Sequence, residues 1–97
     1  MSAESSPFRL LSTPGFERDC RKISHGNSAV VGAMEELLAI LRRDPHNRNG
    51  KYKIKKLAGY KAGEGQWRIR WKEYRLRYDI FADDVVLYSF RHRKEAY

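Results

Sequence analysis

Ten basic residues in the second half of the chain have the types and spacing needed to hold a polyanion. They occupy alternate positions of strand-like segments or lie in the terminal run, and they are Lys51, Lys53, Lys55, Arg68, Arg70, Arg75, Arg77, Arg91, His92 and Arg93. Arginine is a permanent cation with a planar fork that matches phosphate oxygens, so such a surface could hold a nucleic-acid backbone and stabilise charge developing on a phosphoryl group. Arginine does not deprotonate in proteins, so a general base must come from elsewhere.

Cleaving RNA without a metal requires a base for the ribose 2'-hydroxyl, stabilisation of the phosphoryl transition state and an acid for the leaving 5'-oxygen. The candidate proton carriers are His92, Tyr97 and a lysine with cationic neighbours, such as Lys53 or Lys55. An imidazole ordinarily changes charge near neutral pH, which favours His92. A lone histidine near a terminus is also commonly an ordinary surface residue, so the proton carrier is left open.

The sequence predicts neither a metal nor an organic cofactor. The carboxylates and histidines have no paired ligand spacing, and Cys20 is the only cysteine, so a cysteine-based zinc site and an internal disulfide are excluded. Several aromatic residues could stack on nucleobases, although most alternate with the basic residues and are therefore expected in the core: Tyr52, Tyr60, Tyr74, Tyr88, Trp67 and Trp71.

Residues 66–80 carry the clearest structural pattern, two runs of strict alternation between apolar and basic residues. Folding the runs back with Trp71 opposite Tyr74 places Arg70 opposite Arg75 and, one pair further along, Arg68 opposite Arg77. Like charges facing across a strand pair cost roughly 0.2–1 kcal/mol, so folding gives no reason for this arrangement. Either the long side chains are merely solvated, or the face binds an anionic partner.

The formal charge of +8 is unevenly distributed. Residues 1–50 hold seven Lys and Arg against six Asp and Glu, whereas residues 51–97 hold thirteen against six. Positive charge concentrated in one half favours polyanions such as nucleic acid or an acidic protein segment. Solubility alone is the alternative explanation.

A chain of 97 residues is long enough for one modest core. We expect residues 1–7 to be a disordered tail and residues 8–97 to form a single domain. No apolar run approaches the length of a membrane span, and the first residues have neither a basic region nor an apolar region typical of a leader. The sequence therefore predicts a soluble, cytoplasmic protein.

The first half predicts one strand and two helices. Residues 8–11 predict a strand, and Thr13 followed by Pro14 is a helix-start signal. A second helix begins at Asn27 or Ser28 and runs to about Arg43, where cations complement its dipole.

The second half predicts four strands. These are residues 51–57, the two arms of 66–80, and 85–90, with residues 58–65 as a mobile, glycine-bearing connection. The order β-α-α-β-β-β-β predicts an α+β fold in which two N-terminal helices pack on a small, mostly antiparallel sheet.

These segments carry a resemblance to a known family. The motifs that carry it are Asp44-Pro45, Lys56-Leu57-Ala58-Gly59, Trp67-Arg68-Ile69-Arg70, Tyr74-Arg75-Leu76, a short acidic turn, and His92-Arg93 before Tyr97. In this order, from Phe8 onward, the chain resembles the RelE/ParE superfamily of toxin–antitoxin toxins. The resemblance implies a small sheet with two N-terminal helices on one side, as the periodicity also predicts.

Resemblance to the RelE branch implies a ribosome-dependent, metal-independent endoribonuclease, an mRNA interferase that inhibits translation. It implies function for basic residues of the third and fourth strands and for a C-terminal Arg and Tyr, matched here by Arg68, Arg70, Arg75, Arg93 and Tyr97. It also implies a cognate antitoxin that wraps the toxin. Many relatives have Gly where this chain has Arg91, so which of Arg91, His92 and Arg93 faces the substrate stays open.

Our hypothesis is therefore an mRNA-cleaving toxin, with mRNA, the ribosome and an antitoxin as partners. Its catalytic residues are predicted to be Arg70, Arg75, His92, Arg93 and Tyr97, and its RNA-binding residues Lys53, Lys55, Arg68 and Arg77. The alternatives are a ParE-like inhibitor of DNA gyrase and a basic nucleic-acid-binding module without catalysis.

Overall fold

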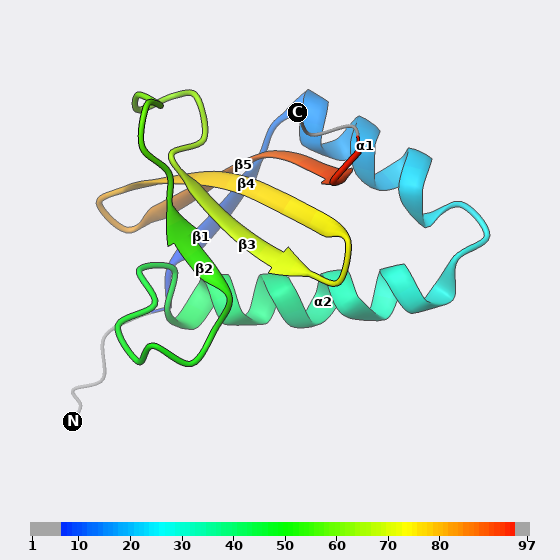
Figure 1. The fold of residues 1–97 in the computed structure, drawn as a ribbon, viewed down its shortest axis with the longest axis horizontal. Helices are drawn as coiled ribbons and strands as arrows, with labels where there is room; N and C mark the ends of the chain where they lie inside the picture. Colours follow the sequence, from blue (N-terminus) through cyan, green and yellow to red (C-terminus); the bar gives the residue numbers. More distant parts are fainter. Residues whose placement is uncertain (1–6, 95–97) are drawn as a thin grey trace.

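A computed structural model describes residues 7–94 and shows two helices packed on a five-stranded sheet (Figure 1). The elements in chain order are β1 (Arg9–Ser12), α1 (Pro14–Ser24), α2 (Ser28–Arg43), β2 (Ile54–Lys56), β3 (Trp67–Trp71), β4 (Tyr74–Phe81) and β5 (Asp84–His92). The strand order is β1-β5-β4-β3-β2, with β1 parallel to β5 and every other pair antiparallel. The predicted α+β fold is confirmed.

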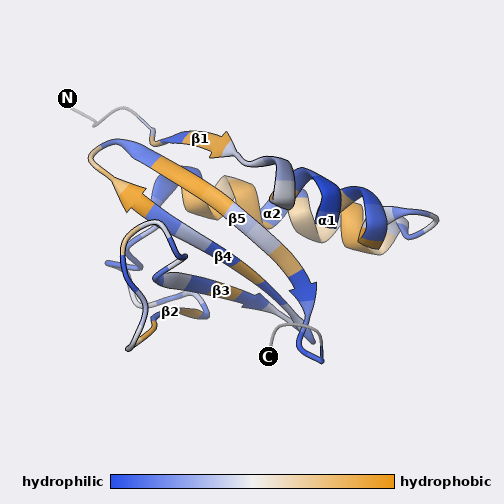
Figure 2. Cartoon of the chain, turned by 90° about the horizontal axis from the view of Figure 1, so that it is seen from above, coloured by the Kyte–Doolittle hydropathy of each residue, from blue (hydrophilic) through white to orange (hydrophobic). Residues whose placement is uncertain are grey.

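Both helices lie on one side of the sheet, and the opposite face of β2, β3 and β4 is uncovered (Figure 2). The core between the layers combines apolar residues from α1, α2 and the three long strands: Phe16, Val30, Leu37, Leu41, Ile69, Leu76, Tyr78, Val85, Leu87 and Phe90. Burial of these side chains supplies the main driving force for folding.

The helix starts follow the sequence signals. The Thr13 hydroxyl accepts a hydrogen bond from the Phe16 backbone N–H at 3.2 Å, and Pro14 occupies the first helical position. Asn27, rather than Ser28, caps α2, with its side-chain oxygen accepting from the Val30 N–H at 3.2 Å. Each cap satisfies a backbone donor that the first helical turn leaves unpaired.

The register predicted for residues 66–80 is confirmed in full. Trp71 pairs with Tyr74, Ile69 with Leu76 and Trp67 with Tyr78. A one-residue slip would move this entire apolar set from the core to the open face, so burial fixes the register.

The strand predicted at residues 51–57 is shorter than expected, because β2 covers only Ile54–Lys56. The Asn47 side chain donates to the Tyr52 carbonyl and accepts from the Tyr52 N–H, which holds the preceding residues in a loop. Tyr52 therefore lines a surface cleft with Phe8 and His46 instead of entering the core as predicted. The last strand is longer than the predicted 85–90, because β5 is paired on both edges, with β1 and β4.

Tyr78 links the sheet to the end of α2, and its side chain is fully buried. Its hydroxyl donates to the Pro45 carbonyl at 2.7 Å, and burial raises the pKa of Tyr78 above its usual value. In the folded state Tyr78 stays protonated, whereas an unfolded tyrosine loses this proton above about pH 10. The free energy of unfolding is therefore expected to fall as the pH rises above about 10.

We expect Tyr78→Phe to lower the free energy of unfolding by about 1 kcal/mol at neutral pH, since it removes one buried hydrogen bond. Between pH 10 and 11 the wild type should lose about 1 kcal/mol more stability than the variant. Urea unfolding across this pH range measures both effects, with Tyr60→Phe, at an exposed ring, as control. Parallel pH profiles for wild type and Tyr78→Phe would contradict the assignment.

Candidate nucleic-acid interface

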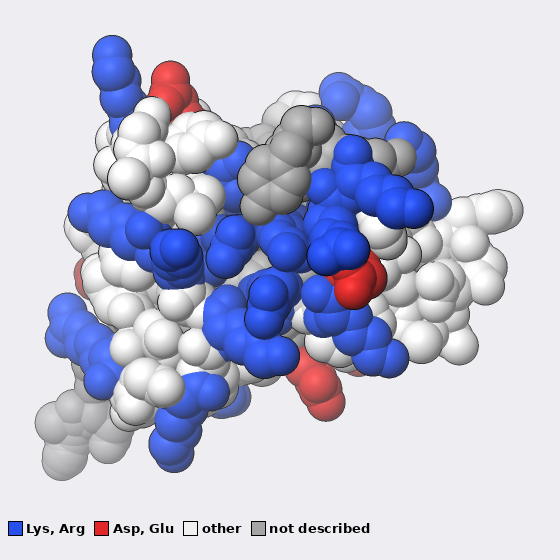
Figure 3. Space-filling model, viewed as in Figure 1, with Lys and Arg blue, Asp and Glu red and all other residues white. Residues whose placement is uncertain are grey.

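The uncovered face of the sheet is a surface of Lys and Arg side chains (Figure 3). Strand pairing aligns them in two rows across the sheet, because paired residues direct their side chains to the same face. One row is Lys55, Arg68 and Arg77, and the other is Arg70, Arg75 and Arg91. The predicted facing pairs are thus confirmed, and β5 adds a third arginine beside Arg75.

Two arginines of this side already form ion pairs with carboxylates. Arg91 Nε lies 3.2 Å from the Asp19 carboxylate on α1, and Arg93 Nε lies 2.7 Å from Glu73 in the β3–β4 turn. Among residues 7–94, no acidic partner neutralises Lys53, Lys55, Arg70 or Arg75. These four side chains therefore carry unneutralised positive charge on the face.

Arg75 is the most constrained of the four. Its Nε and Nη1 atoms are buried and have no hydrogen-bond partner within the described part of the chain. Leaving buried donors unpaired costs about 1–3 kcal/mol or more for a charged group. Because both atoms are shielded from the surface, an anion in the adjoining space would meet the positive charge of this guanidinium rather than these two N–H groups.

Arg75 lines a groove of about 250 Å³. The residues around it are Lys55, Lys56, Leu57, Ala58, Tyr60, Arg68 and Arg77. The groove is thus lined by cations of the strands and, as one wall, by residues of the connection between β2 and β3.

That connection, which the sequence predicts to be mobile, is attached to the sheet by hydrogen bonds at its C-terminal end. The Asp79 carboxylate on β4, buried on the open face, accepts backbone N–H bonds from Gly63 at 2.5 Å, Gly65 at 3.2 Å and Gln66 at 2.6 Å. Gly65 has φ +84°, and a Cβ there would lie 3.2 Å from the Cβ of Arg77, so glycine is required.

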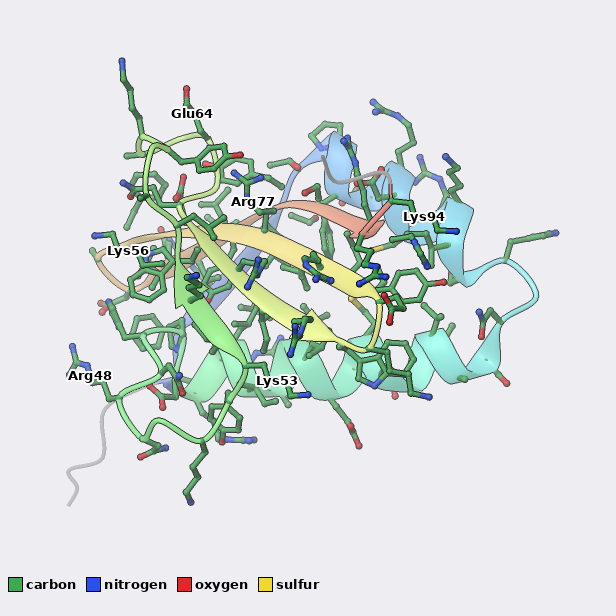
Figure 4. All side chains as sticks on the ribbon, in the orientation of Figure 1. Arg48, Lys53, Lys56, Glu64, Arg77 and Lys94 are labelled. Carbon is green, nitrogen blue, oxygen red and sulfur yellow. The ribbon has the colours of Figure 1, made fainter. Side chains whose placement is uncertain are left out.

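Arg77 reinforces this anchor (Figure 4). Its Nε donates to the Gly65 carbonyl at 2.8 Å and its Nη2 to the Glu64 carbonyl at 3.0 Å. Its guanidinium carbon lies 4.1 Å from the centre of the Tyr60 ring. Three contacts therefore hold Arg77, predicted as an RNA ligand, against the loop.

The structure does not bring His92 to the arginine face. His92 pairs with Tyr74, whose ring packs on the core, and the two rings meet edge to face at 5.3 Å. The cause is a β-bulge: Tyr78 pairs with Leu87 and Arg77 with Ser89, which leaves one extra residue on β5 and reverses the alternation.

The remaining predicted site residues separate into two groups. Arg68, Arg70, Lys53 and Lys55 lie on the same face as Arg75, and Lys53 adjoins Arg70 through a backbone bond of 3.0 Å. Arg93 is tied to Glu73, and Tyr97 lies outside the described residues. The sequence alone did not identify Asp79 and Asp19 as structural residues. For Asp79, the signal is an aspartate at an outward position of a strand.

Metal and thiol chemistry find no support in the described residues. No group of three His, Cys, Asp or Glu side chains among residues 7–94 is placed to hold a metal ion. Burial raises the pKa of the Cys20 thiol to about 11, which keeps it protonated and unreactive. Within the same residues no helix has the length and apolar character of a membrane span.

Comparison with known proteins now identifies the family. Residues 10–97 match the family described as the ParE toxin of type II toxin–antitoxin systems. The chain belongs to this family. It is therefore a toxin of the RelE/ParE superfamily, as its motifs predict. No curated protein gives a significant sequence match.

Two solved structures share the fold. The toxin–antitoxin complex RelBE2 from Mycobacterium tuberculosis contains a chain with 26% identity and a TM-score of 0.68, covering 90% of this chain and 99% of that one. The RelB–RelE antitoxin–toxin complex from Methanococcus jannaschii contains one with 23% identity and a TM-score of 0.65, covering 87% and 91%.

We expect Asp79→Ala to release the groove wall, because three backbone donors lose their acceptor. The free energy of unfolding should fall by about 2–4 kcal/mol, the range for losing a buried, multiply bonded charged acceptor. Amide hydrogen exchange at residues 63, 65 and 66 should accelerate more than in the core strands. Asp83→Ala, at an exposed turn, is the charge-matched control; equal exchange in both variants would refute the anchor.

Proposed function

We propose that this toxin is a metal-independent endoribonuclease that cleaves mRNA on the ribosome. The observation that carries the proposal is Arg75, which has no acidic partner among residues 7–94 and lines a groove together with other cations. A phosphodiester is the anion that such a surface on a toxin of this superfamily would bind. Binding to the phosphates of the RNA backbone requires no base-specific contact.

Arg70 and Arg75 face each other across β3 and β4 and would hold the scissile phosphate between them. Their charges offset the negative charge that builds on the phosphoryl oxygens in the transition state. Arg68 in the groove wall, with Lys53 and Lys55 toward the sheet edge, would hold flanking phosphates. The repulsion between paired arginines is then offset by the substrate.

The chemistry consists of a transfer within the RNA. A base removes the 2'-hydroxyl proton, the 2'-oxygen forms a bond to phosphorus, the bond from phosphorus to the 5'-oxygen breaks, and an acid protonates the leaving oxygen. The products are a 2',3'-cyclic phosphate and a 5'-hydroxyl. Since His92 lies on the other face, Lys53, Lys55 and Tyr97 are the proton carriers that we propose.

A cognate antitoxin is the second partner that we propose. Both structural relatives are complexes of a toxin with its antitoxin. An antitoxin segment with carboxylates at its surface would complement Lys53, Lys55, Arg70 and Arg75 and exclude RNA from the groove.

Inhibition of DNA gyrase is the alternative function, favoured by the match to the ParE toxin family. In that case the basic face would serve as a protein or DNA contact without cleavage. Binding of nucleic acid without catalysis is a further alternative that the same charges would support.

Arg75→Ala should lower mRNA cleavage by about 100- to 1,000-fold, the loss typical for removing one preorganised donor to the transition state. Arg75→Lys should restore little, since the fork is lost while the charge stays. The measurement is the mapping of RNA 5' ends after induction, and of cleavage by the purified toxin on programmed ribosomes. Arg18→Ala, at an exposed position on α1, is the control.

The same variants separate the alternatives. Intact transcripts in arrested cells, together with loss of supercoiling by purified gyrase, would establish the gyrase function and refute cleavage. RNA affinity that survives in Arg75→Ala while cleavage is lost would show that binding alone does not account for toxicity.

Binding of single-stranded RNA should weaken with salt in proportion to the phosphates contacted. For contacts from Lys53, Lys55, Arg68, Arg70 and Arg75, the slope of log affinity against log salt should be about −3.5, at about −0.7 per contact. Arg75→Ala should reduce the slope by about 0.7, and Arg18→Ala should leave it unchanged. Fluorescence anisotropy at several salt concentrations measures it; a slope near zero would exclude a phosphate-binding face.

A further inference from the structure

One wall of the Arg75 groove is apolar and aromatic. Leu57, Ala58 and Tyr60 come from the connection between β2 and β3 and line the groove together with its lysines and arginines. Tyr60 is 41% exposed, whereas the aromatic residues Trp67, Trp71, Tyr74 and Tyr78 of β3 and β4 belong to or pack on the core. An anion-binding face has no need of an exposed ring, so Tyr60 requires its own explanation.

The Tyr60 ring is held in place by contacts that leave it accessible. Arg77 lies over the ring at 4.1 Å, and its guanidinium is fixed by the carbonyls of Gly65 and Glu64. The Tyr60 carbonyl accepts from the Gln66 side chain at 3.2 Å, and Asp79 anchors the loop from below. A ring positioned before binding loses little conformational entropy when a ligand stacks on it.

We propose that Tyr60, backed by Arg77, is a nucleobase-stacking subsite adjoining the phosphate position at Arg75. This inference rests on the proposed function and adds the recognition of an unpaired nucleotide. A nucleotide combines a phosphate, which Arg75 binds, with a flat aromatic base, which Tyr60 stacks upon. An acidic peptide would satisfy the cations and leave the ring unused.

The subsite should read the presence of a base more strongly than its identity. Leu57 and Ala58 offer no side-chain hydrogen-bond groups to the edges of a base. Selectivity then follows stacking strength, so a purine should bind better than a pyrimidine and both better than an abasic sugar. Cleavage sites of the wild type should show the corresponding purine preference at one position.

The test is a double-mutant cycle between the ring and the base. Fluorescence anisotropy measures binding of short 2'-O-methyl RNAs, which cannot be cleaved, with an abasic site placed at each position in turn. Tyr60→Ala should weaken binding of the complete RNA by about 5- to 150-fold, the range of one base–aromatic stack. One abasic position should weaken wild-type binding by a similar factor and add no loss in Tyr60→Ala.

Matched controls isolate the ring. Tyr60→Phe should bind as the wild type does, and Tyr60→Leu, which keeps apolar bulk without an aromatic face, should bind as Tyr60→Ala does. Phe81→Ala removes another ring that is 41% exposed, at the end of β4, and should leave affinity unchanged.

The outcomes distinguish the subsite from the function on which it rests. Additive losses in the cycle, or unchanged affinity in Tyr60→Ala, would overturn the subsite, while Arg75-dependent cleavage would still uphold the ribonuclease. Failure of the wild type to bind RNA or to cleave mRNA would overturn both. Coupled losses together with mRNA cleavage would support both.

Discussion

The pairing of β3 with β4 is the constraint on which the rest of this toxin depends. Burying Ile69 against Leu76 and Trp67 against Tyr78 fixes the register, because a slip of one residue would expose the whole apolar set. The same register forces Arg70 against Arg75 on the open face. The core therefore determines the geometry of the open face. The hydrophobic burial on the core side of the sheet offsets the repulsion between the arginines on the open side.

The three aspartates that are buried among the described residues accept mainly backbone hydrogen bonds. Asp79 accepts three backbone N–H bonds from one loop, and Asp44 accepts those of Arg48 and Asn49 after α2. Asp19 accepts the N–H of Phe90 and also holds Arg91. These carboxylates fix loops and elements around the sheet, and of the three only Asp19 also pairs with a cation of the open face, Arg91. The result is a rigid frame with a concentrated positive field at its centre.

The predictable features are those encoded by local periodicity. Alternation in residues 66–80 gave the hairpin register, and the Thr13-Pro14 and Asn27 signals gave the helix starts. The position of His92 was not accessible, because the bulge that reverses alternation in β5 depends on pairing with β4. The anchored loop was likewise missed, because Asp79 and Gly63 are sixteen residues apart and only the folded sheet brings them together. Long-range contacts of this kind leave no periodic pattern.

Arg75 indicates how binding and folding are connected in this toxin. A face built only for solubility would leave its guanidinium groups in water, as it does for Arg70. Arg75 instead keeps two buried donors without a partner among the described residues, which lowers the stability of the free protein. An anion that binds beside this guanidinium in the folded state and not in the unfolded chain stabilises the fold by mass action. Folding and binding are thus connected through the charge of Arg75, because an anion in the groove offsets part of the electrostatic cost that the free toxin carries there.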